Sequence, residues 1–401
     1  MKPAPASYLV DGLHQLVNAI DKPALETKGL DGVVCGHTDL IGFYDDRTEY
    51  CGQNVARLCK EGSFEAVMWL LLNDEMPDSE RLADCCSILS DSAVIDQPIA
   101  DMVSAVPLQT RPLDLFPVAI SLLSCFDPTP CDRTLPASRS QFWRVMAQTP
   151  VLMHVAFGGS LNEGRAITDE SRTLSWAGQL LQILRDDHAP PTPREEHAFN
   201  VLMICQCLTE MRPACFLMRL FGSIVNDVVA GLKASSSMYV SQLRNDPYTW
   251  MSSRLRRLRS PQEAESWFAK RSSPIPCGFE PAEALAGSHP EEDNQLRQDP
   301  RALLLKEQCR QLLGTMGGLI LESVSARLEN LMAHNAMAPT MDWASTRLMM
   351  LLDVPDDRMS LAVGLARMVG WAAQTLEQFD SGVSLLPELH YAETELPQPP
   401  A

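Results

Sequence analysis

Residues 359–379 read MSLAVGLARMVGWAAQTLEQF, and this stretch decides the class of the fold. Its apolar side chains recur at steps of three and four residues, at Leu361, Leu365, Met368, Ala372 and Leu376. That spacing is typical of a helix that buries one face. The preceding turn, Pro355-Asp-Asp, places two acids where the positive end of a helix dipole stabilises them. We therefore predict one helix over the whole stretch.

The same period dominates the rest of the chain. From Leu305 to Leu331 apolar positions recur at three- and four-residue steps, which predicts one long helix. Only residues 31–52 set short apolar pairs among Gly and Asp, a pattern that favours one small β-ribbon near the N-terminus. Residues 272–300 mix prolines, acids and small residues, so we expect a loop there. The sequence thus predicts an all-α fold with a minor β element.

The composition is that of a folded globular protein, since 45% of the 401 residues are apolar and 21% are charged. The formal charge of −18 repels phosphate backbones, so nucleic acid is not an expected partner. No stretch reaches the roughly 18 uninterrupted apolar residues that a membrane-spanning helix needs. The opening MKPAPASYLVDGLHQ lacks the continuous apolar segment of a signal peptide. We expect a cytoplasmic protein with no membrane partner.

The chain contains twelve cysteines, which we expect to be reduced thiols because no secretory signal is predicted. Cys85-Cys86, Cys205-x-Cys207 and Cys215 lie within apolar, helix-like runs. No Cys/His grouping has the spacing of a zinc site. A free cysteine packs as a small apolar residue. We therefore predict packed thiols and no metal.

One basic cluster interrupts the acidic chain. Ser253-Arg-Leu-Arg-Arg-Leu-Arg259 carries four arginines. Two interpretations are open: a solvated helix face, or a local anion site, for example for the phosphate of a cofactor.

Several blocks of the sequence carry a family resemblance. The blocks are Gly29–Val34, Tyr50–Leu58, Ser63–Leu72, Ser121–Asp127, Asp299–Ala302 and Ala366–Gln378. In order and spacing they resemble blocks of citrate synthases, among them G-L-E-G-V-V, S-F-E-E-V-x-x-L-L and A-R-T-V-G-W. The resemblance extends over about residues 29 to 391.

This resemblance implies a domain organisation. We expect the citrate-synthase fold, with a large helical domain at residues 1–238 plus 353–401 and a smaller inserted helical domain at residues 239–352. It also implies a homodimer and an active site in the cleft between the two domains. A coenzyme A thioester is the implied substrate, and no cofactor is expected to be permanently bound.

Citrate synthases remove a proton from the methyl group of acetyl-CoA and add the enolate to the ketone of oxaloacetate. This chemistry requires a carboxylate base and a donor for the thioester oxygen. Thr340-Met-Asp342-Trp aligns with the family's N-V-D-F, whose Asp is the base, so the resemblance gives Asp342 that role. From the local pattern alone, Asp342 is the N-cap of the helix that follows.

Two further positions match groups that contact the keto acid. Arg367 falls on the Arg of A-R-T-V-G-W, which binds a carboxylate; the alternative is a surface arginine on an amphipathic helix. His289, in Gly287-Ser-His289-Pro, resembles the His of G-H-P-L-Y, which polarises the ketone. Its interval to Asp299 is three residues longer than in the family, and a loop histidine without a role is the alternative.

Other family positions have lost their residues. The H-A-D-H-E helix aligns with the run from Cys205, where Cys205 and Leu208 stand in place of histidines. In the K-G-P-x-H-G-G-A-N loop, Ser237 takes the place of the histidine that stabilises the enol. Glu388 replaces an arginine of the C-terminal R-P-R, and its charge would repel a dicarboxylate.

These losses favour a citrate-synthase-like pseudoenzyme, a dimer that scaffolds, regulates or pairs with an active paralogue. A working enzyme that condenses an acyl-CoA with oxaloacetate or a related keto acid is the alternative, supported by Asp342 and Arg367. A metabolite-binding sensor is the third possibility. His197 and His154 are the nearest candidates by segment to restore an imidazole near Ser237.

Overall fold

The computed structural model describes residues 29–30, 32–44, 46–162, 174–209, 211–270, 276–281 and 299–387. The chain divides into two compact units, Met1–His37 and Thr38–Ala401, and all the elements below belong to the second. The helices of its first half are α3 (Val55–Glu61), α4 (Phe64–Asn73), α5 (Ser79–Ser92), α6 (Gln97–Ser104), α7 (Pro112–Cys125), α8 (Leu135–Ala156), α10 (Trp176–Leu184) and α11 (Pro193–Gln206). Those of its second half are α12 (Pro213–Ile224), α13 (Val228–Gln242), α14 (Pro247–Arg257), α15 (Pro261–Lys270), α16 (Pro300–Gln311), α17 (Met316–Ala333), α18 (Met341–Leu351), the 3-10 turn η2 (Asp356–Arg358) and α19 (Met359–Ser381).

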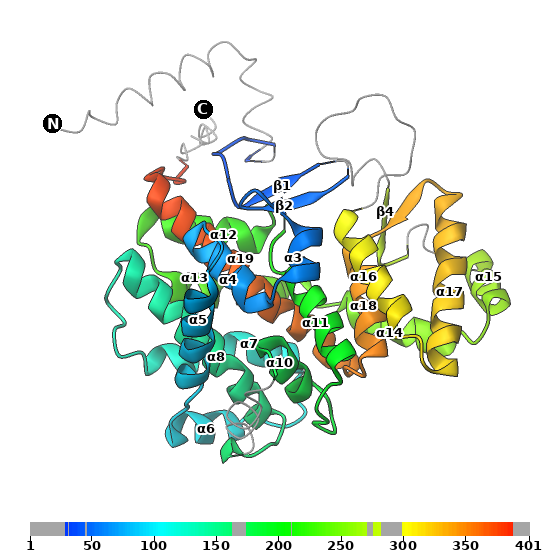
Figure 1. Ribbon diagram of the computed structural model, residues 1–401, viewed down its shortest axis with the longest axis horizontal. Helices are drawn as coiled ribbons and strands as arrows, with labels where there is room; N and C mark the ends of the chain where they lie inside the picture. The colour runs from blue at the N-terminus through cyan, green and yellow to red at the C-terminus, as the bar shows by residue number, and fades with distance from the viewer. Residues whose placement is uncertain are drawn as a thin grey trace, which may run out of the picture. The chain divides into compact units, whose positions relative to one another are not determined.

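The predicted helix at residues 359–379 is confirmed as α19, and it organises the core. Every residue from Met359 to Leu376 except Arg367 is buried. Partners therefore surround the helix: it packs against α4, α7, α8, α11, α12, α13 and α14. Figure 1 shows α4 and α12 beside it. A helix that is apolar around nearly its whole circumference is stable only in such an interior position.

The helices between residues 247 and 351 pack mainly on one another. α16 packs on α18, α15 on α17, and α14 on both α17 and α18, as the grouping in Figure 1 illustrates. α11 contacts α16 and α18 as well as α3, α4 and α19, so it connects this group to the helices around α19. The predicted division into residues 1–238 plus 353–401 and residues 239–352 stays a prediction.

The single helix predicted from Leu305 to Leu331 is wrong. The structure has two helices, because α16 ends at Gln311 and α17 begins at Met316. The hydroxyl of Thr315 accepts a hydrogen bond from the backbone N–H of Gly318 and starts the second helix as its N-cap. The apolar spacing continues in phase across the break, so periodicity alone could not reveal it.

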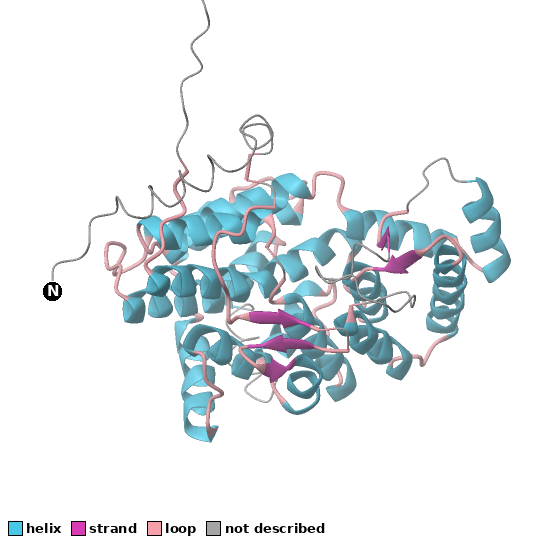
Figure 2. Ribbon diagram, turned by 90° about the horizontal axis from the view of Figure 1, so that it is seen from above, coloured by secondary structure: helices cyan, strands magenta, loops and turns pink. Residues whose placement is uncertain are grey.

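Two small sheets complete the fold. β1 (Ile41–Phe43) pairs antiparallel with β2 (Thr48–Tyr50), and β3 (Gln53–Asn54) extends this sheet, which confirms the ribbon near the N-terminus. β4 (Phe279–Pro281) pairs with β5 (Met337–Pro339) in a second sheet that the sequence did not predict. Part of the expected loop at 272–300 is therefore a strand. Figure 2 shows the two sheets apart from each other among the helices.

Of the cysteines named in the sequence analysis, Cys85, Cys205, Cys207 and Cys215 are buried thiols. The prediction of a packed thiol is wrong for Cys86, which is exposed on the outer face of α5. Among the residues that the structure describes, no group of three or more His, Cys, Asp or Glu side chains is placed to hold a metal ion. Within the same residues, no helix has both the length and the apolar character needed to cross a bilayer.

Candidate active site

The start of α18 and the interior of α19 bring Asp342 and Arg367 together. Asp342 lies in the first turn of α18, and Arg367 is the one residue between Met359 and Leu376 of α19 that is not buried. Nη2 of Arg367 lies 3.6 Å from Oδ1 of Asp342. The interpretation of Asp342 as an N-cap is wrong, because the hydroxyl of Thr340 caps α18 by accepting from the N–H of Trp343. The interpretation of Arg367 as a surface arginine is wrong as well, because the side chain is only 18% exposed.

Two neutral side chains fix the carboxylate of Asp342. The phenolic Oη of Tyr248 donates to Oδ1 at 2.6 Å, and Nε2 of Gln206 donates to the same oxygen at 3.3 Å. Gln206 also accepts from Nη2 of Arg367 at 3.3 Å and donates to Ser345 at 2.8 Å. Within the described residues, all these contacts fall on Oδ1, and Oδ2 has no protein hydrogen-bond partner. The carboxylate is thus oriented with one oxygen engaged and the other available.

The surroundings of Asp342 keep Tyr248 neutral and Arg367 positively charged. Burial, followed by the charge of Asp342, raises the pKa of Tyr248 well above its ordinary value, so its hydroxyl stays a donor. Burial alone would lower the pKa of Arg367, but the neighbouring Tyr239, Tyr248 and Asp342 raise it above the ordinary value. The guanidinium carbon of Arg367 also lies 5.3 Å from the centre of the Tyr239 ring, a cation–π contact.

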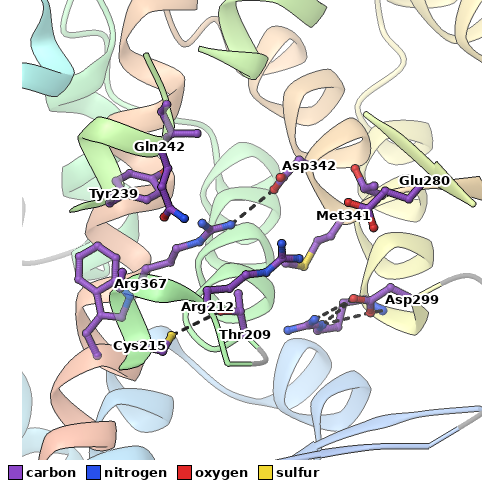
Figure 3. A pocket seen from close by; sticks show the side chains of 15 residues that line it. Thr209, Arg212, Cys215, Tyr239, Gln242, Glu280, Asp299, Met341, Asp342 and Arg367 are labelled. Atoms are coloured by element: carbon purple, nitrogen blue, oxygen red, sulfur yellow. Dashed lines mark hydrogen bonds and ion pairs between the residues drawn. The ribbon is translucent and has the colours of Figure 1, made fainter. Parts of the chain in front are cut away.

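Asp342, Arg367 and Tyr239 line a cavity of about 220 Å³. The charged residues of its described lining are Arg212, Arg301, Arg367, Glu280, Asp299 and Asp342. Figure 3 shows that Arg212 and Arg367 extend into the cavity from the same side, and that Glu280 lies beyond Met341 on the opposite side. The described lining therefore balances three arginines against three carboxylates.

Arg301 is committed to the structure around the cavity. Its guanidinium forms a bidentate ion pair with Asp299 and donates to the carbonyl oxygen of Leu208 at 2.6 Å. A further contact to the hydroxyl of Tyr50 completes its surroundings, and the side chain is 2% exposed. The sequence identified Asp299–Ala302 as a family block but did not predict that Arg301 lines the site.

The family model described as citrate synthase, C-terminal domain, matches residues 29–386. This chain belongs to the citrate synthase family. It is 25% identical over 368 residues to citrate synthase 2 of Bacillus subtilis, covering 91% of this chain and 95% of that protein. It is 22% identical over 375 residues to 2-methylcitrate synthase 1 of Corynebacterium glutamicum, covering 92% and 95%.

The fold agrees with solved citrate synthases. The enzyme of Thermoplasma acidophilum, in a ternary complex with carboxymethyl coenzyme A and oxaloacetate, superposes with a TM-score of 0.75. The match covers 93% of this chain and 98% of that one at 16% identity. The predicted all-α citrate-synthase fold is thereby confirmed.

The two positions at which we predict lost histidines are not among the described residues that line the cavity. Cys205, in the last turn of α11, and Leu208, just beyond it, are buried, and their carbonyl oxygens accept from Arg301. The thiol of Cys205 packs 3.8 Å from that of Cys59. Gln206, between them, is the residue that reaches Asp342. The sequence missed it because nothing in the local pattern of α11 indicates which residue faces α18.

Ser237 does not face the cavity. It is exposed on α13, and its hydroxyl donates to the carbonyl of Lys233 in the same helix. Two other residues of α13, Tyr239 and Gln242, line the cavity instead. No motif pointed to them, and their spacing of three on one helix face was the only available signal.

The candidate histidines do not supply an imidazole in the described structure. His197 is exposed on α11, and His154 is buried on α8, where its ring centre lies 4.6 Å from that of His188. No histidine lines the cavity among the residues described. His289 and Glu388 lie outside the described residues, so their predicted roles stay predictions.

The arginine cluster at the end of α14 lies away from these groups. Arg254 packs between Trp250 and Trp267, with its guanidinium carbon 5.5 and 5.3 Å from their ring centres. Arg256 forms an ion pair with Asp356. Both interpretations of the cluster stay open.

Proposed function

We propose that this chain is a citrate-synthase-like protein with impaired condensation activity, which keeps the cavity as a binding site and acts as a scaffold, regulator or sensor. One observation carries the proposal. The carboxylate at the position of the family's base is held by Tyr248, Gln206 and Arg367, and no histidine lines the described cavity.

The chemistry explains why this observation matters. Enolate formation from a thioester requires a donor at the oxygen where negative charge develops, and loss of one such donor costs about 10²–10³ in rate. In addition, Glu388 in place of an arginine opposes binding of a dicarboxylate.

Release of free coenzyme A from acetyl-CoA and oxaloacetate tests the proposal. We expect no release above background from the folded wild-type protein, and the same from Asp342→Asn. Asp380→Asn, an exposed acid at the end of α19, is the matched control for loss of one charge. Turnover by wild type and by Asp380→Asn that disappears in Asp342→Asn would overturn the proposal.

A working acyltransferase is the second candidate, and one observation favours it. Asp342 Oδ2 has no protein partner in the described part of the chain, as required of a carboxylate that accepts a proton from a substrate. An enzyme that uses His289 would lose activity in His289→Asn as well as in Asp342→Asn. Propionyl-CoA assayed in parallel with acetyl-CoA would reveal a changed acyl specificity.

We also propose a cytoplasmic homodimer that can pair with an active paralogue. The support is the family membership and, for partnership, the altered site. Light scattering of the purified protein gives the oligomeric state, and co-expression with a tagged active citrate synthase from the same cell tests for mixed dimers. A monomer in light scattering would contradict the proposed homodimer. A tagged enzyme that recovers none of this chain would contradict the proposed pairing with a paralogue.

A further inference from the structure

The contact between Arg367 and Asp342 leaves a donor and an acceptor side by side. Arg367 uses only Nη2 in its contacts with Asp342 and Gln206. Among the described residues, its Nη1 and Nε have no hydrogen-bond partner, and neither does Oδ2 of Asp342. Both residues line the cavity. Figure 3 shows them facing each other.

The charge of the lining points in the same direction. A site that binds a dicarboxylate is favoured by an excess of cations, because both carboxylates lose their hydration and need charged partners in the lining. Among the lining residues that the structure describes, three arginines are balanced by three carboxylates. Arg301 and Asp299 neutralise each other in their bidentate pair. A ligand that carries one positive and one negative group suits this arrangement better than oxaloacetate does.

The cavity has room for a small organic ligand. Its volume of about 220 Å³ is many times the roughly 10–15 Å³ that one water molecule needs by the same kind of measure. In an α-amino acid the ammonium and carboxylate are attached to the same carbon. The ammonium can therefore donate to Asp342 while the carboxylate accepts from the neighbouring Arg367.

We propose that the cavity binds a small α-amino acid, with its carboxylate on Arg367 and its ammonium on Oδ2 of Asp342. Arg212, which lines the same cavity, adds positive charge on the carboxylate side. The inference rests on the proposed loss of condensation activity, since it exchanges the ketone of the family's keto acid for an ammonium. The retained carboxylate then serves as a counter-ion and not as a base.

Calorimetry with matched ligands tests the proposal. L-aspartate and oxaloacetate share a carbon skeleton and differ in the ammonium and the ketone, and succinate has neither group. We expect L-aspartate to bind wild type at least about tenfold more tightly than oxaloacetate or succinate, the effect of one charge-assisted hydrogen bond. Asp342→Asn should weaken L-aspartate at least tenfold and leave succinate unchanged or tighter, while Asp380→Asn should match wild type.

Each result decides the matter. Oxaloacetate binding without L-aspartate binding, or equal L-aspartate affinity in Asp342→Asn, would overturn the amino-acid assignment and leave the impaired-enzyme proposal standing. Release of coenzyme A would overturn the impaired-enzyme proposal, whatever L-aspartate does. Absence of binding by all three ligands to wild type would overturn both the assignment and the binding role. The wild-type ligand comparison stands even if Asp342→Asn fails to fold.

Discussion

The hydroxyl of Tyr248 lies 2.6 Å from Oδ1 of Asp342 and joins the first turns of α14 and α18. Asp246 holds Tyr248 in place, because its carboxylate caps α14 by accepting from the backbone N–H groups of Tyr248 and Thr249. The orientation of the carboxylate in the cavity therefore depends on the capped end of a different helix.

Removing this hydroxyl in Tyr248→Phe should lower the free energy of unfolding by about 1.5–3 kcal/mol, because a buried hydrogen bond to a charged group is lost. Urea denaturation measures the change. Tyr44→Phe is the control: Tyr44 is 48% exposed, and we expect an effect within about 0.5 kcal/mol. Equal effects of the two substitutions would show that the contact with Asp342 contributes no stability.

A buried ion-pair network stabilises the helices near the cavity. Arg347, on α18, is 1% exposed and contacts the carboxylates of Glu322 and Glu329 on α17. Arg347→Ala should cost about 3–5 kcal/mol, because two glutamates lose their buried partner. Arg310→Ala breaks an exposed pair with Glu307 and should cost less than about 1 kcal/mol. Chemical denaturation of both variants provides the test, and a loss for Arg347→Ala no larger than for Arg310→Ala would contradict it.

Close packing of α19 requires a glycine at position 370. A Cβ there would lie 2.2 Å from the carbonyl oxygen of Cys207 and 2.8 Å from the side chain of Leu208. Gly370→Ala should destabilise the protein by about 1–3 kcal/mol through overpacking. At exposed Gly317 in α17, the nearest atom would be 3.9 Å away, so Gly317→Ala should stabilise by about 0.5–1 kcal/mol. Opposite shifts in Tm are expected, and shifts of the same sign would refute this account.

The start of α11 makes stability depend on pH. Burial alone would raise the pKa of Glu195, but hydrogen bonds from Thr192 and Arg185 outweigh it and lower the pKa. A lowered pKa in the folded state adds stability above the pKa of the unfolded chain, and this stability is lost as the pH falls through the folded value. The difference in unfolding free energy between wild type and Glu195→Gln should therefore shrink from pH 7 to pH 3.

Glu80→Gln, at an exposed position in the first turn of α5, makes the same change in charge and should stay within about 0.5 kcal/mol of wild type at pH 7. A wild-type advantage over Glu195→Gln that is constant across this range would show that the capping interactions do not depend on ionisation.

The elements that could be predicted from the sequence are those with long or distinctive patterns. α19 was predicted from the three- and four-residue spacing of its apolar side chains. The ribbon of β1 and β2 was predicted from short apolar pairs set among Gly and Asp residues. The break at Thr315 and the pairing of β4 with β5 were missed, since a helix restart in phase and three-residue strands leave little pattern.

The candidate site divides in the same way. The resemblance identified Asp342 and Arg367, and the structure brings them within 3.6 Å. Gln206, Tyr239 and Tyr248 come from α11, α13 and α14, and only the tertiary packing brings them to one carboxylate and one guanidinium. Local sequence patterns do not predict such tertiary contacts between helices that lie far apart in the chain.

The interior position of α19 has a consequence for synthesis on the ribosome. The helices α4, α7 and α8 all end by Ala156, yet each packs against a helix that begins at Met359. At roughly 5–20 residues per second, α8, the last of the three, is translated roughly 10 to 45 seconds before Ser381 is added. During that interval the surfaces that pack on α19 lack this native partner, so the nascent chain is expected to depend on chaperones until its last long helix has been translated.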